Sequence, residues 1–147
     1  MSEDLKAKAL RLLARREHTR AELAKKLSGE AGRDEIDAVL DRLQQAGLLS
    51  DARFAESLVA ARGARFGAAR LRHDLKAKGV AEEVIAGALP QDAEAERVRA
   101  REVWRRKFGA APADRADYAR QARFLQQRGF AAEIIRKVLR EQEEQEE

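Results

Sequence analysis

Residues 75–89 read LKAKGVAEEVIAGAL, and the basic residue, glycine and apolar residue at positions 78–80 decide how the stretch folds. Such a triplet occurs where a turn binds a phosphate, and also where one helix ends and the next begins. Glycine commonly ends a helix in the left-handed conformation, and the apolar residue after it packs back on the last turn. A lysine before it suits the negative end of the helix. We therefore interpret Gly79 as a helix stop and keep only Lys78 as a candidate for function.

The same pattern returns 50 residues later without a gap, because residues 125–139 read LQQRGFAAEIIRKVL. Gly129 takes the place of Gly79, a basic residue precedes both glycines, and an apolar residue follows both. A looser copy lies early in the chain, where a longer turn replaces Lys-Gly-Val. Its apolar positions are Leu23, Leu27, Ile36 and Leu40. Repeats of about 40–50 residues are too small to bury a full core alone, so we expect three tandem three-helix repeats stacked into an elongated, curved array.

The composition favours an all-α fold. Ala, Leu, Arg, Glu, Lys and Gln dominate, Asn is absent, and there are only two prolines in 147 residues. The dominant residues are strong helix formers, and no stretch alternates apolar and polar residues as a strand would. We predict nine helices in three groups, with repeat 1 at residues 1–49, repeat 2 at 50–91 and repeat 3 at 92–141. An acidic tail at 142–147 is expected to lack a fixed structure.

Three predicted helix starts carry the signature of an N-terminal cap. Thr19 and Glu22 fit a capping box, in which the hydroxyl accepts the amide three residues on and the carboxylate reaches back. Ser50-Asp51 and Asp114 provide the other two caps. These caps place the starts of the second, fourth and eighth predicted helices.

The charge is unevenly distributed along the chain. The net charge is +4, but residues 141–147 hold five carboxylates and no base, so residues 1–140 hold 30 Lys and Arg against 21 Asp and Glu. A basic body suits a polyanionic partner or an acidic protein surface, although solvated helix faces explain the charge equally well. The acidic tail either extends freely or folds back on the basic face and competes with the partner.

Residue types that carry catalytic chemistry are missing or scattered. Cysteine is absent, which excludes disulfides, thiolate nucleophiles and Cys-based metal sites. His18 and His73 lie far apart, and we assign the first a structural role and the second a place on the surface. Gly29 and Gly32 form a Gly-x-x-Gly, but no Gly-Lys-Ser/Thr follows, so a Walker loop is excluded. We predict a protein that is not an enzyme, needs no cofactor and binds no metal.

Nothing in the sequence points to a membrane. No apolar segment approaches the length of a membrane span. The first ten residues, MSEDLKAKAL, lack the apolar core of a signal peptide. We expect a soluble, cytoplasmic monomer.

Basic residues gather within residues 62–78, 97–107 and 115–128, and the first of these segments contains a single acid, Asp74. If the repeats stack, equivalent faces align the three clusters into a stripe that suits nucleic acid or a nucleoprotein surface. The alternative is that these side chains only solubilise an Ala/Leu core. We favour the functional interpretation because acids are scarce locally and abundant elsewhere.

Repeat 1 taken alone also resembles part of a winged-helix DNA-binding domain, as found in transcriptional regulators. Thr19–Leu27 and Asp34–Leu43 would form its helix-turn-helix, with a recognition helix at residues 33–42 in a major groove. A wing requires a β-hairpin after Gly47, whereas Ser50–Ala55 is expected to open another helix. We rank this interpretation second.

The whole chain resembles the bacterial RecX family, regulators of the RecA recombinase. Four stretches carry the resemblance, in family order and over nearly the full length. They are ALRLLARREHTRAELAKKL (9–27), DARFAES (51–57), ARFGAARLRHDLKAKGV (64–80) and RFLQQRGF (123–130). Each alone is a weak helix pattern, but four in order are fairly specific. Asp74 stands where the family often has Glu, and EQEEQEE is a terminal extension outside these motifs.

The resemblance implies three tandem three-helix repeats, in agreement with the periodicity, and it also implies a role. RecX-like proteins bind in the helical groove of the RecA filament on single-stranded DNA and bridge its protomers. They damp the ATPase, strand-exchange and co-protease activities of the filament. This would place the chain in homologous recombination, DNA repair and the SOS response, with or without weak direct binding of DNA.

We expect basic residues of the second and third repeats to contact acidic filament surface or DNA phosphate. They are Arg65, Arg70, Arg72, Lys76, Lys78, Arg105, Arg106, Arg120, Arg123 and Arg128. We assign the larger aromatic residues to cores or to seams between repeats. They are Phe66, Trp104, Phe108, Phe124 and Phe130.

Overall fold

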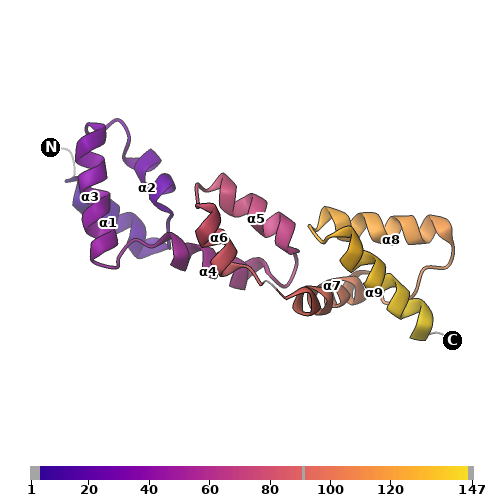
Figure 1. Ribbon diagram of the computed structural model, residues 1–147. Helices are drawn as coiled ribbons and strands as arrows, with labels where there is room; N and C mark the ends of the chain where they lie inside the picture. Colours follow the sequence, from indigo (N-terminus) through magenta and orange to yellow (C-terminus); the bar gives the residue numbers. More distant parts are fainter. Residues whose placement is uncertain (1–3, 91, 146–147) are drawn as a thin grey trace. The chain divides into compact units, whose positions relative to one another are not determined.

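The computed structural model describes residues 4–90 and 92–145, and these residues form nine helices and no strand (Figure 1). The helices are α1 (Leu5–Arg15), α2 (Arg20–Leu27), α3 (Arg33–Gln45), α4 (Asp51–Arg62), α5 (Ala68–Ala77), α6 (Glu82–Ala88), α7 (Ala93–Lys107), α8 (Arg115–Gln127) and α9 (Ala132–Gln145). The predicted all-α fold is confirmed. The elongated, curved arrangement of the repeats stays a prediction.

The chain divides into two compact units. Unit 1 comprises Met1–Ser57 and Leu75–Ala88, and unit 2 comprises Leu58–Asp74 and Leu89–Glu147. Helix α4 begins in unit 1 and ends in unit 2, and α5 begins in unit 2 and ends in unit 1.

Helices α1, α2 and α3 pack against one another in unit 1 (Figure 1). The buried side chains between them are Ala9, Leu23, Leu27, Ile36, Leu40, Leu43 and Leu49. The set includes all four apolar positions predicted for the first repeat. Each fully buried leucine contributes about 1.5–3 kcal/mol relative to an exposed one, so this small core can hold three short helices together.

Helices α7, α8 and α9 form the corresponding core of unit 2 (Figure 1). Trp104 and Phe130 are buried in it, as predicted, and the indole Nε1 of Trp104 donates to Oε1 of Gln121 at 2.7 Å. Phe108 and Phe124 are only partly buried and pack at the margin of this core. The two rings therefore keep part of their area on the surface of unit 2.

Helix α9 is longer than predicted. The sequence predicts a tail without fixed structure from residue 142, but α9 continues through Gln145. Gln142 is buried and its Nε2 donates to the Val138 carbonyl at 3.1 Å, while Glu141 accepts two hydrogen bonds from Arg97 of α7 at 2.7 and 2.8 Å. These contacts give the last turns of α9 a partner, which is why they are helical. Residues 146 and 147 of the predicted tail lie outside the described residues.

The triplet at residues 78–80 ends α5 as predicted. Gly79 has φ +84°, its amide donates to the Lys76 carbonyl at 2.9 Å, and the Val80 amide donates to the Leu75 carbonyl at 3.1 Å. This hydrogen-bond pair defines the Schellman motif, which satisfies carbonyls that the helix end leaves unpaired. The copy at Gly129 has φ +92° and the same two bonds, at 2.9 and 3.2 Å.

Gly79 also joins α5 to the start of α2 within unit 1. A Cβ at Gly79 would lie 2.5 Å from the Ala21 Cβ, closer than side-chain atoms approach. The Thr19 hydroxyl donates to the Lys78 carbonyl at 2.7 Å while it accepts the Glu22 amide, which confirms the predicted capping box. The glycine is therefore required twice, for its positive φ and for its missing side chain.

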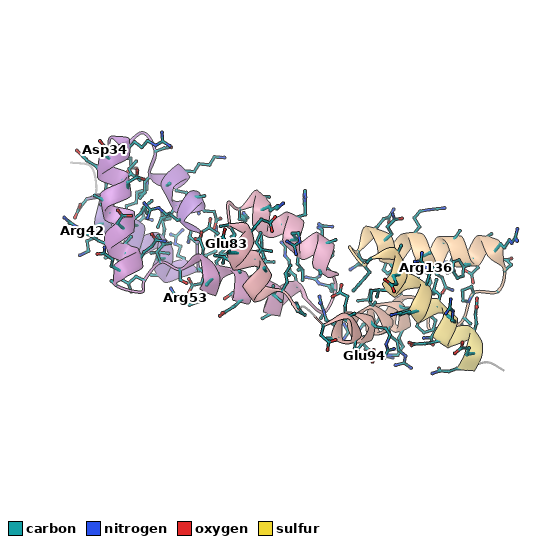
Figure 2. All side chains as sticks on the ribbon, in the orientation of Figure 1. Asp34, Arg42, Arg53, Glu83, Glu94 and Arg136 are labelled. Atoms are coloured by element: carbon teal, nitrogen blue, oxygen red, sulfur yellow. The ribbon has the colours of Figure 1, made fainter. Side chains whose placement is uncertain are left out.

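The first turn of α4 closes this junction. Asp51 Oδ1 accepts the first amide of α2, from Arg20, at 2.8 Å. Arg53, labelled in Figure 2, donates to Glu17 at 2.5 Å and to the Gly47 carbonyl at 2.9 Å. Because α4 follows Leu49 directly, no hairpin stands where a winged-helix domain would place its wing.

A second junction in unit 2 repeats this geometry between α5 and α8. A Cβ at Gly129 would lie 2.4 Å from the Arg70 Cβ. The Gly67 amide donates to the Arg128 carbonyl at 2.7 Å, and the Ala69 amide donates to the Gly129 carbonyl at 3.2 Å. In both junctions a helix start packs against the glycine that ends another helix.

Replacing Gly79 by alanine should lower the free energy of unfolding by about 2–4 kcal/mol, because a positive φ costs about 1–2 kcal/mol and the clash with Ala21 adds to it. Gly29 is the matched control, since it holds the same position after α2 with φ +89° but has open space around its Cβ. Gly29→Ala should show only the backbone cost. Urea unfolding followed by circular dichroism measures both, and equal losses would contradict the close approach at Gly79.

His18 should make the stability of the fold depend on pH. Burial lowers the pKa of His18, and the nearby cations Arg16 and Lys26 lower it further, although a bond to the Arg16 carbonyl and the charge of Glu22 oppose them. The unfolded chain therefore binds this proton more readily than the folded chain does. The free energy of unfolding that neutral His18 contributes is present above the ordinary histidine pKa and is lost as the pH falls through that value.

The urea midpoint should therefore decrease as the pH is lowered from about 7.5 to 5.5, and His18→Gln should reduce that decrease. His73→Gln, which removes an exposed imidazole, serves as the control. A His18→Gln variant that keeps the full wild-type dependence would disprove this role of His18.

Candidate functional site

The ten predicted contact residues divide between the two units. Lys76 and Lys78 belong to unit 1. The other eight belong to unit 2, and they are Arg65, Arg70, Arg72, Arg105, Arg106, Arg120, Arg123 and Arg128. Among the eight, Arg70, Arg72 and Arg128 are half-buried and the rest are exposed.

Helix α7 holds the segment that connects α4 to α5. Glu96, only 8% exposed, accepts the Ala68 amide at 2.8 Å and Arg99 Nη1 at 2.8 Å. Arg99 in turn donates to the carbonyls of Gly63 at 3.0 Å and Phe66 at 2.6 Å. One partly buried ion pair thus anchors both ends of this short segment to α7.

The anchored segment presents Phe66 to three guanidinium groups. Arg70 Cζ lies 4.7 Å from the centre of the Phe66 ring, Arg128 Cζ lies 5.3 Å from it, and Arg65 Cζ lies 6.0 Å from it. Cations at these distances are attracted by the face of an aromatic ring, by about 0.5–1 kcal/mol each at exposed sites. The sequence analysis placed Phe66 in a core or in a seam between repeats, and the ring does lie at such a seam, since Arg65 and Arg70 belong to repeat 2 and Arg128 belongs to repeat 3.

Two more rings continue the arrangement on α7 and α8. Phe108 and Phe124 meet edge to face with centroids 5.4 Å apart. Arg128 Cζ lies 4.9 Å from the Phe124 centre, Lys107 Nζ lies 5.4 Å from the same centre, and Arg120 Cζ lies 5.0 Å from the Phe108 centre. We call these residues the cation–ring cluster. It comprises Phe66, Phe108, Phe124, Arg65, Arg70, Lys107, Arg120 and Arg128.

Two hollows flank Phe124 on this surface. The arginine hollow has a volume of about 270 Å³ and is lined by Ala64, Arg65, Val103, Arg106, Lys107, Phe124 and Arg128. The phenylalanine hollow has a volume of about 300 Å³ and is lined by Lys107, Phe108, Arg120, Arg123, Phe124 and Gln127. The hollows share Lys107 and Phe124, and no carboxylate lines either of them among the described residues.

Several of the predicted arginines already have a carboxylate partner. Arg105 and Arg106 contact Glu102 at 2.6 and 3.4 Å. The hydrogen bond from Arg105, with the charges of both arginines, outweighs desolvation and holds the pKa of Glu102 below its usual value. Arg120 contacts Asp117 at 2.7 Å, and Arg70 contacts Asp74 at 3.3 Å.

Four cations around the two hollows differ in this respect. They are Arg65, Lys107, Arg123 and Arg128. None of them makes an ion pair with a carboxylate in residues 4–90 or 92–145. Uncompensated cations in a fixed position attract anions more strongly than cations already paired.

Lys76 and Lys78 belong to a different basic hollow, in unit 1. It has a volume of about 370 Å³ and is lined by Ala21, Glu22, Lys25, Lys26, Lys76, Ala77, Lys78 and Gly79. Burial opposes ionisation of Glu22, but bonds from Arg16 and the Thr19 amide outweigh it and lower the pKa of Glu22 to about 2. The carboxylate is therefore charged at neutral pH and pairs with Arg16 at 3.0 Å and with Lys78 at 3.5 Å, while Lys76 pairs with Glu82. Glu22 is the one carboxylate in the described lining, against four lysines.

The sequence analysis missed some of these residues and overrated others. Lys25 and Lys26 were overlooked, because only the junction at Gly79 brings α2 beside the end of α5. Lys107 belonged to a predicted basic cluster but not to the predicted contacts. Arg97 and Arg99, from the same cluster, are engaged inside unit 2 by the bonds described above.

The described part of the chain shows neither a membrane span nor a cluster of metal ligands. In residues 4–90 and 92–145 no helix is long and apolar enough to cross a membrane. Nor do three or more His, Asp or Glu side chains gather there as a metal ion would require.

Comparisons with known proteins give the chain a family context. Models of the first, second and third three-helix domains of RecX match residues 6–43, 50–89 and 94–139. "Regulatory protein RecX" of Leptothrix cholodnii is 52% identical over 92% of this chain and 87% of its own length. The protein of the same name from Herminiimonas arsenicoxydans is 49% identical over 97% and 95%.

Solved structures show the same fold. The crystal structure of RecX from Lactobacillus salivarius superimposes with a TM-score of 0.82, at 21% identity, over 95% of this chain and 94% of that one. A second crystal structure, of a regulatory protein RecX, gives a TM-score of 0.75 at 23% identity, over 92% of this chain and 73% of that one. Three tandem three-helix domains are thus the architecture of this chain.

Glu96→Ala should destabilise unit 2, because it leaves the Ala68 amide and one Arg99 donor without partners. The expected loss is about 2–3 kcal/mol for two partly buried donors. Glu102→Ala on the same helix removes a half-exposed carboxylate whose partners Arg105 and Arg106 are exposed, and should change the urea midpoint little. A Glu96→Ala variant as stable as Glu102→Ala would show that Glu96 does not anchor the segment.

Proposed function

This chain belongs to the RecX family of regulatory proteins, and from that premise we propose that it is a negative modulator of the RecA recombinase. The observation that carries the proposal is the match of three successive domains over nearly the whole chain, to relatives named as regulatory proteins. The regulator would bind in the groove of the RecA filament on single-stranded DNA. There it would damp ATP hydrolysis, strand exchange and co-protease activity by occupying the groove, without catalysing a reaction.

The basic surface supports this mode of action. Arg65, Lys107, Arg123 and Arg128 present positive charge that no described carboxylate neutralises. The lysines around the hollow of unit 1 add a second basic site on the same chain. When two such sites engage one filament, the second contact forms at a high effective concentration, so individually weak contacts add up to stable binding.

Charge also predicts how such binding would depend on salt. Electrostatic attraction accelerates encounter with a polyanion and depends on salt. A protein that neutralises six to ten phosphates loses roughly 10³–10⁵ in affinity between about 50 and 200 mM salt. Inhibition of the filament should therefore weaken as salt rises.

Adding the wild-type protein to RecA on single-stranded DNA should lower the rate of ATP hydrolysis at concentrations well below that of RecA. Arg65→Glu combined with Arg123→Glu should weaken this inhibition by about tenfold or more, because each reversal replaces attraction with repulsion at an unpaired cation. Arg140→Glu, a reversal at an exposed residue of α9 outside both hollows, is the matched control.

The same assay separates the alternatives. Inhibition by the double variant equal to that by the wild type would remove this surface from the mechanism. Tight, sequence-specific binding to duplex DNA without any effect on ATP hydrolysis would instead revive a transcriptional regulator. Circular dichroism of each variant confirms that helicity is retained.

A further inference from the structure

A groove of unit 2 lies between α8 and α9 and shares only Arg123 with the two hollows described above. It has a volume of about 430 Å³, and its lining includes Tyr118, Ala122, Arg123, Gln126, Ile135 and Arg136. Ile135 is buried and Tyr118 is half-buried, whereas the two arginines and the glutamine are exposed. We call it the α8–α9 groove. It combines an apolar floor with a basic, polar rim.

The two arginines on the rim of this groove have no carboxylate partner. In the described part of the chain neither Arg123 nor Arg136, which is labelled in Figure 2, makes an ion pair. The nearby carboxylate of Glu133 contacts Lys137 instead, at 3.8 Å. Unpaired cations attract anions more strongly than paired ones do, so the groove suits an acidic segment that also brings some apolar surface.

The same unit carries an acidic segment without a partner. Glu143 and Glu144 lie in the last turns of α9 and are exposed. Neither makes an ion pair within residues 4–90 and 92–145, although Arg140 lies one turn before them. Residues 143–147 hold four carboxylates and no base, and we call them the acidic end of α9. Its charge is complementary to that of the groove.

The acidic end cannot enter the groove of its own chain. Arg136 and Glu143 belong to one continuous helix, and the seven residues between their positions separate them by about 10 Å along its axis. The bonds from Arg97 to Glu141, at 2.7 and 2.8 Å, hold this part of α9 against α7. A second copy of the chain can present the same segment without this restriction.

We propose that the acidic end of α9 in one copy docks into the α8–α9 groove of a second copy. Its carboxylates contact Arg123 and Arg136, and Gln126 bonds the glutamine among them, since an amide both donates and accepts. The methylene groups of the long Glu and Gln side chains lie against Tyr118 and Ile135. This contact goes beyond the proposed function and rests on it only for the filament on which copies meet.

The contact is heterologous, because the groove and the acidic end are different surfaces of one chain. Every pair leaves one groove and one acidic end free, so copies add in a row unless the rotation between them closes a ring. Exposed ion pairs are individually weak, so the dilute protein stays the predicted monomer. Neighbouring copies on a filament would meet at a high effective concentration, at which weak contacts form.

Sedimentation velocity tests the proposal on the full chain, with no recombinase or DNA present. The weight-average sedimentation coefficient of the wild type should rise with concentration up to about 0.5 mM at low salt, near the effective concentration of linked sites. High salt should abolish the rise, because it screens exposed charges. Glu143→Lys with Glu144→Lys reverses the acidic end, and Gln126→Glu with Arg136→Glu reverses the groove. Each double variant alone should stay monomeric.

An equal mixture of the two double variants should associate again. The lysine end of one variant then meets the glutamate groove of the other, and the remaining end and groove are both wild type. Glu56→Lys with Glu83→Lys is the matched control, because it makes the same change of net charge as the end variant at exposed positions of unit 1. It should associate as the wild type does, and circular dichroism checks the helicity of each variant.

Three results would overturn the proposal. They are a wild type that stays monomeric throughout, double variants that associate as well as the wild type, and a mixture that stays monomeric. A monomeric mixture whose groove variant has also lost RecA inhibition would assign the groove to another protein. Association restored by mixing supports the inference even if the wild type leaves ATP hydrolysis by RecA unchanged, so its outcome is independent of the proposed function.

Discussion

Two close approaches of a helix start to a glycine join neighbouring repeats, one within each unit. At Gly79 the start of α2 comes within 2.5 Å of where a Cβ would stand, and at Gly129 the start of α5 comes within 2.4 Å. Each glycine also ends its own helix with a positive φ. The same residue thus ends one helix and contacts the start of another. A side chain at either position would therefore disturb both the helix end and the junction.

The candidate site follows from the junction at Gly129. The Arg128 carbonyl accepts the Gly67 amide, which sets the segment that carries Arg65 and Phe66 beside the end of α8. The ion pair of Glu96 and Arg99 then ties the same segment to α7. Structural contacts of the backbone and buried side chains therefore bring together cations that belong to different repeats.

Most of the fold could be predicted from local sequence. Helix formers, the Thr19 capping box and the repeated Lys/Arg-Gly-apolar triplet all act within a few residues, so their hydrogen bonds can be inferred without knowing what lies nearby. The burial of Trp104 and Phe130 followed from apolar spacing in the same way. The continuation of α9 did not, because it depends on contacts such as that of Glu141 with Arg97, 44 residues away in the chain.

The sequence by itself determined the helical content, the helix ends other than that of α9, and the basic character of the second and third repeats, because these depend on propensity, periodicity and composition. Only the tertiary structure decided which cations are neutralised and which stay available. Lys25 meets the hollow of Lys78, and Phe66 meets Arg128, through junctions that join residues about 60 positions apart, such as Thr19 and Lys78. The charge of a side chain follows from its residue type. Whether an opposite charge neutralises it depends on its neighbours in space, and tertiary packing decides which residues so far apart in the chain become neighbours.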